Sequence, residues 1–252
     1  MSHRQSPFCL LIADLKLKLR VVSKYMVRQA KRNNSAPGLR DLNKAKRREA
    51  ILDSTLRLLR EANLENVSIE AIAAEAGVAP ATVYNLVGSR DKLLVACVDR
   101  VLESLVTDLA QIRINDSPVE AALAIVKGSC EVFIADGNAF RQIVGAVNGL
   151  ARSGESISMD PAQLQVSAMR AAKDAGLLCD DADPTSMGRQ IFLSYNGAMF
   201  AWAAQKLADD GFRAAAVHGL WTVLLAYTSE SHRELFARLA RSAARDLVAA
   251  EH

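Results

Sequence analysis

Turn-forming and strand-forming residues are scarce in this chain of 252 residues. It contains 13 glycines and 6 prolines, fewer than a typical globular protein of this length has, and only 5% of its residues are aromatic. Runs of β-branched residues are also few, so the composition argues against sheets and predicts an all-α protein. Half of the residues are hydrophobic, which excludes a chain that is disordered throughout.

The patterns of membrane, metal and disulfide proteins are also missing. No apolar stretch reaches the roughly 20 uncharged residues of a membrane span, and charges follow the apolar residues 8–12 too soon for a signal peptide. The four cysteines lie far apart without a C-x-x-C pair, and the four histidines do not cluster with them. We therefore expect no metal, no cofactor and no disulfide framework, and a place in the reducing cytoplasm.

The motifs of several enzyme classes are absent as well. The sequence has no phosphate-binding G-x-x-x-x-G-K-[ST], no G-x-G-x-x-G after a strand, no G-x-S-x-G and no H-E-x-x-H. Since no group of residues indicates catalysis, we predict that the protein is not an enzyme.

Positive charge is concentrated at the beginning of the chain. The first 50 residues carry thirteen Lys and Arg against three acidic residues, a net of +10, so the rest of a chain with net charge +3 carries −7. A basic front on a mildly acidic body predicts contact with a polyanion, although a solvated basic tail has the same pattern. We expect residues 1–43 to form a flexible basic arm, and Met26 is a second candidate for the start of translation.

From residue 43 onward, capping residues mark the starts of the helices. Asn43, Ser68 and Ser89 each precede an amphipathic pattern. About ten helices follow, in a domain over residues 44–104 and a larger one over residues 110–252. Further expected starts are Ser117-Pro118-Val119-Glu120, Asp160-Pro161, Asp183-Pro184 and Ser231-His232-Arg233-Glu234, and expected stops are Asp136-Gly137, Ser153-Gly154, Ala175-Gly176 and Asp210-Gly211.

Residues 67–86 are the most informative stretch. Gly77 fits a turn in the left-handed conformation between two short helices, and Pro80 fits the first turn of the second helix. This is the pattern of a helix-turn-helix, whose second helix lies in the major groove of DNA. A tight corner between helices of an unrelated protein has the same pattern. The apolar residues spaced to pack the two helices together are Ile72, Ala73, Val78 and Val83.

Small and polar residues occupy the expected outer positions of the second helix. Thr82 and Asn85 can hydrogen-bond to bases or phosphates, and Ala81 can contact a thymine methyl group. Cations lie on both sides of the motif, where they suit phosphates. The predicted DNA-binding residues are Lys46, Arg47, Arg48, Ser68, Pro80, Ala81, Thr82, Tyr84, Asn85, Arg90 and Lys92.

From about Lys46 to Val98, the chain resembles the DNA-binding domain of the tetracycline-repressor-like (TetR) family of transcriptional regulators. The resemblance rests on Ala76-Gly77-Val78, Thr82-Val83-Tyr84 and the segment from Ser89 to Leu94. It implies that Tyr84 and Arg90 contact phosphates while Thr82 and its neighbours face bases. The chain departs from the family pattern at Asn63, Ala79, Val87 and Arg90, where glycine, a serine-type cap, phenylalanine and lysine are usual.

The resemblance also implies that the larger helical domain binds a small effector, whose presence alters the spacing of two DNA-reading heads. Few charged residues fall within its helices, which favours an apolar or amphipathic effector. Aromatic residues at helical spacing also fill ordinary cores. The candidates for the pocket lining are Phe133, Phe140, Phe192, Tyr195, Met199, Trp202 and Trp221.

Two late helices carry stripes of small residues, which let helices pack closely. Packing within one subunit and packing between two subunits both fit this spacing, and the family resemblance implies a homodimer formed through the last helices. The candidate interface residues are Ser194, Gly197, Ala198, Ala201, Ala215, Gly219, Thr222 and Ala226.

The sequence thus predicts a homodimeric regulator of transcription, a repressor that binds a pseudo-palindromic operator and is released by a small apolar effector. The alternative is a helical interaction or membrane-surface protein whose basic arm binds anionic lipid or nucleic acid without sequence preference. Deleting the arm distinguishes the two, because only the second function depends on it entirely.

Overall fold

The computed structural model describes residues 38–109, 114, 117–150 and 160–250, and all regular structure in these ranges is helical apart from one isolated β-bridge. Ten α-helices occur there, with single 3-10 turns at Leu64–Asn66 and Glu230–His232. The predicted all-α fold is therefore confirmed. The predictions for Met26 and for most of the basic arm fall on residues 1–37, and that for Ser153-Gly154 on residues 151–159; both lie outside the described residues.

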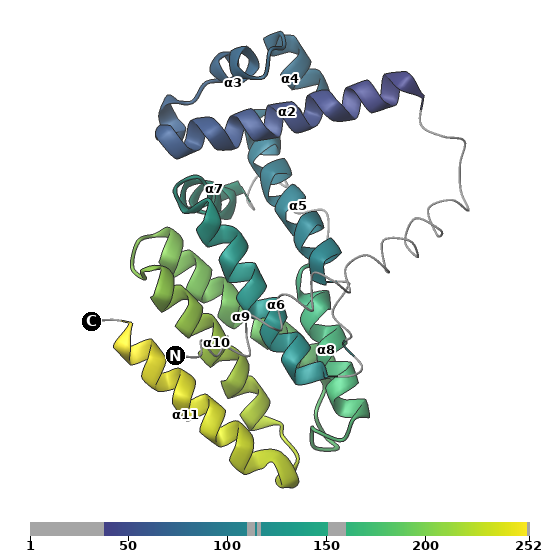
Figure 1. Cartoon of the computed structure of the whole chain (residues 1–252), viewed down its shortest axis with the longest axis vertical. Coiled ribbons are helices and arrows are strands. Elements are labelled where there is room, and N and C mark those ends of the chain that lie inside the picture. Colours follow the sequence, from purple (N-terminus) through teal and green to yellow (C-terminus); the bar gives the residue numbers. More distant parts are fainter. Residues whose placement is uncertain (1–37, 110–113, 115–116, 151–159, 251–252) are drawn as a thin grey trace, which may run out of the picture.

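A small domain at one end of the molecule, here called the head, contains the first helices (Figure 1). Ile51, Leu59 and Val83 are fully buried in its core. Ser68 caps a helix as predicted, since its Oγ accepts a hydrogen bond from the backbone nitrogen of Ala71 at 3.1 Å. The helices of the head are α2 (Leu39–Glu61), α3 (Ile69–Glu75), α4 (Pro80–Leu86) and the first half of α5 (Arg90–Leu109).

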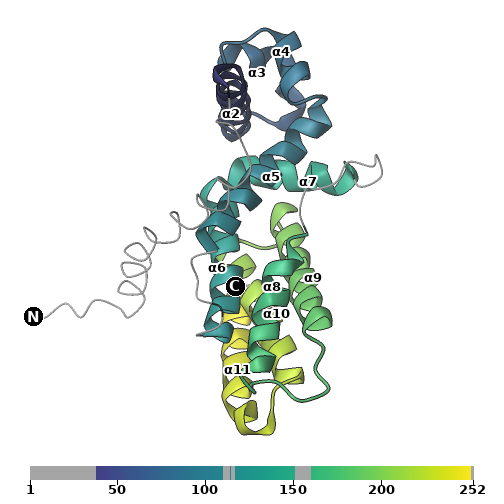
Figure 2. The same cartoon turned by 90° about the vertical axis from the view of Figure 1, so that its right-hand side faces the viewer.

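The remaining helices form a larger domain, here called the body, in which α6, α8, α9 and α10 pack together and α11 covers α10 (Figures 1 and 2). Its centre is aromatic, with the ring of Trp202 stacked on that of Phe212 at 5.3 Å between centroids. No described helix is both long and apolar enough to cross a membrane. The helices of the body are α6 (Pro118–Ala135), α7 (Gly137–Leu150), α8 (Ala162–Asp174), α9 (Pro184–Ala203), α10 (Asp209–Ala226) and α11 (Arg233–Ala249).

Several helix boundaries follow the predicted chemistry. The side chain of Asp183 accepts hydrogen bonds from the first backbone amides of α9, at 3.2 and 2.9 Å. Ser89 does the same at the start of α5, and Gly77 and Gly176 adopt the predicted left-handed backbone after their helices, with φ of +65° and +71°. These boundaries were predictable because each depends on residues close together in the chain.

Other predicted boundaries were wrong. α2 begins at Leu39 after Gly38, so Asn43 lies inside the helix rather than capping it. Gly211 lies in the first turn of α10, where it leaves room for the side chain of Leu207, instead of ending α9. By contrast, α6 begins at Pro118 after Ser117, as predicted, although the Ser117 side chain makes no cap bond. The hydroxyl of Ser231 hydrogen-bonds to the ring of His232, and α11 begins at Arg233 without a side-chain cap bond.

Candidate nucleic-acid interface and ligand cavity

The outer face of α4 is accessible to a large partner. Val83 is fully buried and anchors the helix, while Pro80, Ala81 and Asn85 are exposed. Tyr84 is 53% exposed, a high value for an aromatic side chain. No described element covers this face, which is the condition that the predicted recognition helix had to meet.

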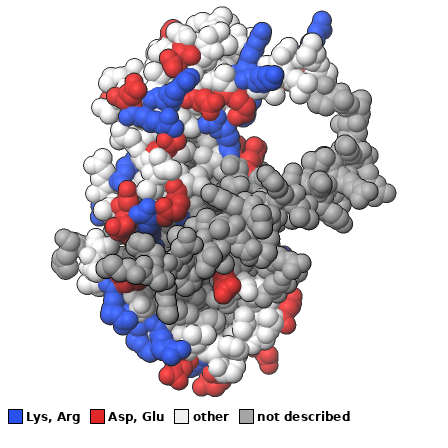
Figure 3. All heavy atoms as spheres, in the orientation of Figure 1, with Lys and Arg blue, Asp and Glu red and all other residues white. Residues whose placement is uncertain are grey.

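A groove runs between α4 and the beginning of α2, and it combines cations with short polar side chains. From α4 it receives Thr82, Asn85 and Leu86. From α2 it receives Arg40, Asn43, Lys44 and Arg47, which recur at the three- and four-residue spacing of one helix face. Lys and Arg side chains are visible along the beginning of α2 in Figure 3. This arrangement can hold a phosphate chain beside groups that hydrogen-bond to bases.

Arg40, Asn43 and Lys44 are not among the DNA-binding residues predicted from the sequence. Because the helix was expected to start at Asn43, the basic face was not continued back by one turn. The spacing of these basic residues could have indicated the groove, because Arg40, Lys44 and Arg47 share a helix face once α2 begins at Leu39.

The other predicted cations lie in different surroundings. Lys46 is exposed on α2 but does not line the groove, and Arg48 lies 3.7 Å from the carboxylate of Glu49. The guanidinium of Arg90 donates to the backbone oxygen of Leu64, so it also holds the turn that follows α2. Lys92 is exposed in the first turn of α5. Their contacts with DNA remain predictions.

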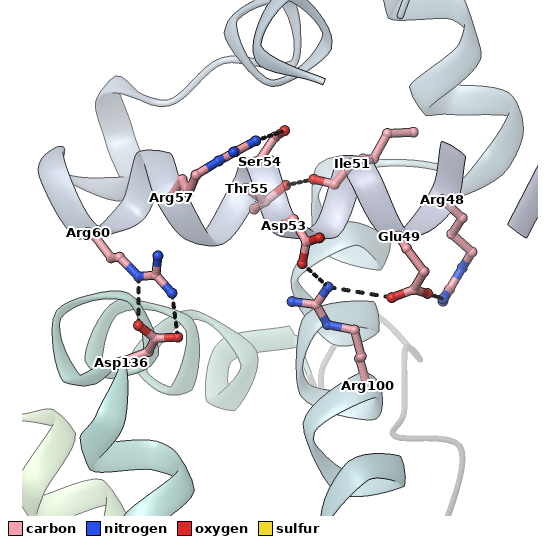
Figure 4. A network of polar contacts seen from close by, with 10 residues as sticks. All are labelled: Arg48, Glu49, Ile51, Asp53, Ser54, Thr55, Arg57, Arg60, Arg100 and Asp136. Carbon is pink, nitrogen blue, oxygen red and sulfur yellow. Dashed lines mark hydrogen bonds and ion pairs between the residues drawn. The ribbon is translucent and has the colours of Figure 1, made fainter. Parts of the chain in front are cut away.

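A set of polar contacts, here called the joint, ties the end of α2 to the start of α7 (Figure 4). Two nitrogens of Arg60 donate to the two carboxylate oxygens of Asp136, at 2.6 and 2.7 Å. The amide nitrogen of Gln142 donates to the backbone oxygens of Leu59 and Ala62, at 2.9 and 3.2 Å. These carbonyls belong to the last turn of α2 and have no partner within the helix, so the body caps a helix of the head.

Helix α5 is a second connection between head and body. Leu93 is buried in the head, and farther along Arg100 donates to Asp53 of α2 at 2.6 Å (Figure 4). Val98 and Leu102, which lie two residues before and two residues after Arg100, line a cavity in the body. A shift of α5 at the cavity would therefore be felt in the head.

The cavity has a volume of about 80 Å³ and lies between α5, α6, α8 and α9. Four of the seven predicted pocket residues line it, namely Phe133, Phe192, Tyr195 and Met199. No charged side chain is among its described lining residues. The other lining residues are Val98, Leu102, Ile125, Val126, Ser129, Pro161, Leu164, Gln165, Ile191 and Asn196.

The other three predicted pocket residues do not line this cavity. Phe140 is buried against the edge of the Phe133 ring, with 5.2 Å between centroids. Trp202 is fully buried in the centre of the body, and Trp221 packs near Phe236 of α11. These aromatic residues fill the core, which the spacing along their helices could not distinguish from a cavity wall.

Two residues that line the cavity each have a buried polar atom without a hydrogen-bond partner. The side-chain nitrogen of Gln165 donates to the backbone oxygen of Ala122 at 3.1 Å, but its oxygen is unpaired. The hydroxyl of Tyr195 is unpaired as well. Burial raises the pKa of Tyr195 well above its ordinary value, so this hydroxyl keeps its proton.

The predicted dimer residues divide between the surface and the interior. Ser194, Gly219, Thr222 and Ala226 line an open groove on α9 and α10, Gly197 is exposed, Ala201 and Ala215 are half-buried, and Ala198 is buried within the subunit. A Cβ atom on Gly219 would lie 2.7 Å from that of Ser194, so this glycine lets α9 and α10 approach closely. Small residues at this crossing therefore serve packing within the subunit, and the dimer remains a prediction.

Comparison with known proteins gives a specific match for the head. The profile of "Bacterial regulatory proteins, tetR family" matches residues 51–97. The HTH-type transcriptional regulator BetI of Brucella canis is 35% identical over 81 residues, which are 32% of this chain and 41% of that protein. The sequence match is therefore confined to less than half of the relative.

Solved structures extend the likeness to the body at the level of the fold. A TetR transcription regulator from Haloarcula marismortui has a TM-score of 0.58 at 17% identity, covering 73% of this chain and all of that one. SmeT, the repressor of the Stenotrophomonas maltophilia multidrug efflux pump SmeDEF, has a TM-score of 0.54 at 23% identity, covering 73% and 91%. The helix-turn-helix, its exposed second helix and the profile match together identify the head as a DNA-binding domain of the tetR family of bacterial regulatory proteins, while the body is similar to these solved structures in fold.

Proposed function

We propose that the protein is a cytoplasmic DNA-binding regulator of transcription, a homodimeric repressor that leaves its operator when a small ligand enters the body. The observation that carries the proposal is the exposed face of α4 beside the basic groove of α2. Phosphate contacts from Arg40, Lys44 and Arg47 would position α4, and Ala81, Thr82 and Asn85 would reach the base edges.

The cavity supports a role for a ligand in regulation. Its volume of about 80 Å³ is smaller than the roughly 150 Å³ that holds benzene in an engineered protein. A larger ligand must move the helices that form the wall, and α5 is one of them. Since α5 continues into the head, ligand entry would alter the position of α4. The binding of ligand and of operator would then be coupled.

The outer groove of α9 and α10 supports a dimer. Leu193 is 60% exposed there, next to the small residues Ser194 and Gly197. A second copy packed on this face would cover Leu193 and form a four-helix interface. Two heads would then read half-sites about 34–36 Å apart, or a multiple of that distance.

The test is the affinity of a double variant, Thr82→Ala with Tyr84→Ala, for an operator duplex selected from a random library. Two lost contacts at about 1–3 kcal/mol each lower the affinity on the order of 100-fold. The control is Glu234→Ala with Arg238→Ala, two exposed residues of α11 at the far end of the molecule. Circular dichroism checks that both variants keep the fold, and equal affinity of both for the operator would reject the proposal.

A shortened chain beginning at Gly38 tests the alternative function. α2 begins at Leu39, so this chain retains the complete head. Sequence-specific binding is expected to survive, because the groove and α4 are intact. Loss of all binding would favour a non-specific polyanion-binding arm over a reader of DNA sequence.

A further inference from the structure

The ligand cavity is apolar except for a few groups, and two of these are unsatisfied. Gln165 of α8 is 4% exposed and Tyr195 of α9 is 8% exposed, and each has one polar atom without a partner. A buried polar group without a hydrogen bond destabilises the folded state, and such groups are rare in folded proteins. Two of them on the wall of one small cavity indicate that a bound molecule completes their hydrogen bonds.

The contacts of Gln165 fix which of its atoms is free. Its amide faces the backbone oxygen of Ala122, 3.1 Å away, and a carbonyl oxygen only accepts hydrogen bonds. The amide nitrogen must therefore face Ala122, which leaves the side-chain oxygen of Gln165 as a fixed acceptor on the cavity wall. The ligand must supply a hydrogen-bond donor to this oxygen.

Tyr195 provides the complementary group. Its buried hydroxyl keeps its proton and can donate it to a ligand. Ser129 lies close enough to lower the pKa of Tyr195 against the larger effect of burial, but no hydrogen bond of standard geometry joins the two hydroxyls. The hydroxyl of Ser129 itself donates to the backbone oxygen of Ile125 at 2.7 Å.

We propose that the ligand is a neutral, largely apolar molecule with one hydroxyl group, which accepts a hydrogen bond from Tyr195 and donates one to Gln165. This inference rests on the proposed function, since it names the ligand class of that regulator. A hydroxyl both accepts and donates at one atom, which suits a cavity of about 80 Å³. A hydrocarbon leaves both protein groups unpaired, an ether leaves Gln165 unpaired, and a carboxylate brings a charge that no described lining residue neutralises.

The test uses three probes of similar size: 4-ethylphenol, 4-ethylanisole and 4-ethyltoluene. Binding of each to the full-length protein is measured by calorimetry. The phenol is expected to bind at least tenfold more tightly than 4-ethyltoluene, with the ether between them. Tyr195→Phe should remove most of this preference, while Tyr227→Phe, a change at an exposed residue outside the cavity, should keep it. Operator binding is measured on the same samples without any probe.

Three results would overturn the proposal. One is equal binding of the phenol and the hydrocarbon, and another is an unchanged preference in Tyr195→Phe. The third is no binding of any probe by a protein that still binds its operator, which would reject the ligand class and leave the proposed function standing. Failure to bind the operator would reject the proposed function alone. Without a probe, Tyr195→Phe should unfold at a higher urea concentration than the wild type, because it removes a buried hydroxyl that has no hydrogen-bond partner.

Discussion

The head and the body meet their proposed partners in opposite ways. The head presents cations and short polar side chains on an outer surface, along α4 and the beginning of α2. The body has its candidate site inside, in a cavity without charged lining residues among those described. An external site can be read from motifs because DNA imposes a fixed spacing on it, whereas an internal site depends on how helices pack. The predictions below test this difference, beginning with the largest effect.

Burial should protect the thiols of Cys97, in the head half of α5, and of Cys130, in the body. Burial raises the pKa of Cys97 and of Cys130 to about 12 from an ordinary 9.0. At pH 8, their thiolate fractions are then roughly a thousandfold below that of a free cysteine, and iodoacetamide should label them correspondingly slowly. Peptide mass mapping over time gives the rate of each, with the half-buried Cys179 as the comparison.

The same shift predicts a pH dependence of stability. The folded state holds these protons more tightly than the unfolded state. Below about pH 8 the thiols are protonated in both states, so the free energy of unfolding does not vary with pH because of them. Above that, their contribution is lost as the pH rises toward 12. Urea should abolish the protection from labelling, and fast labelling of Cys130 in the native protein would mean that the interior of the body is open to the reagent.

The two regions also use glycine differently. In the body, a Cβ atom on Gly188 of α9 would lie 2.5 Å from the backbone nitrogen of Val166 in α8, so Gly188→Ala should reduce the free energy of unfolding by about 3 kcal/mol. In the head, Gly77 has open space but a φ of +65°, so Gly77→Ala should cost only about 1–2 kcal/mol.

Gly145 of α7 supplies the control for both substitutions. It is helical, and a Cβ atom added to it would have no neighbour within 4 Å, so Gly145→Ala should stabilise the protein by about 0.5–1 kcal/mol. Urea unfolding of the three variants gives the order. A Gly188→Ala variant as stable as Gly145→Ala would show that α8 and α9 are not in close contact.

Gly77 and Gly188 illustrate how far the sequence could predict the structure. Gly77 was predictable because a left-handed residue between two short helices has a local signature, as have Ser68 and Pro80. Nothing in the sequence near Gly188 indicates Val166, because their contact arises only when two helices meet. The start of α2 was missed although an acidic residue in its first turn favours a helix there, because the polar Asn43 fits a cap equally well.

The residues of the candidate sites also differ in whether local sequence or helix packing determines their role. The exposed residues of α4 were identified from the motif, because the buried Val83 determines which side chains face outward. In the body, Phe133 lines the cavity while Phe140 packs behind it. Both are apolar and lie on helices, and only the rotation of those helices against their neighbours separates them. Gln165 was not predicted to line the cavity, because a single polar residue in a helix usually faces solvent.

The joint is where the body should stabilise the end of a helix of the head. Gln142→Ala removes the donor to Leu59 and Ala62 and the acceptor of the backbone amide of Leu64. With these groups unpaired, hydrogen exchange of amides at the end of α2 should become about tenfold faster, a change of roughly 1.4 kcal/mol in the opening free energy. Exchange in α9 and α10 should not change.

Gln163→Ala is the matched control, since this exposed glutamine contacts only Asp160 just ahead of its own helix. Exchange that becomes faster in α2 and α9 alike in Gln142→Ala would mean that head and body unfold as one unit. In that case, the joint would add to overall stability rather than connect two regions.

The smallest effect expected concerns single phosphate contacts in the head. Binding to the operator should weaken as salt rises, with a slope of the logarithm of affinity against the logarithm of salt concentration that reflects the number of phosphates neutralised. Arg47→Ala removes one cation from the α2–α4 groove, so this slope should become shallower by about 0.9. Affinity for unrelated duplexes should fall by a similar factor, because a phosphate contact carries no sequence information.

Arg238→Ala, the control, removes an exposed charge from α11 and should leave the slope unchanged. If both substitutions reduce the slope alike, the basic residues act through the net charge of the whole protein, and the external site of the head is less sharply defined than the internal site of the body.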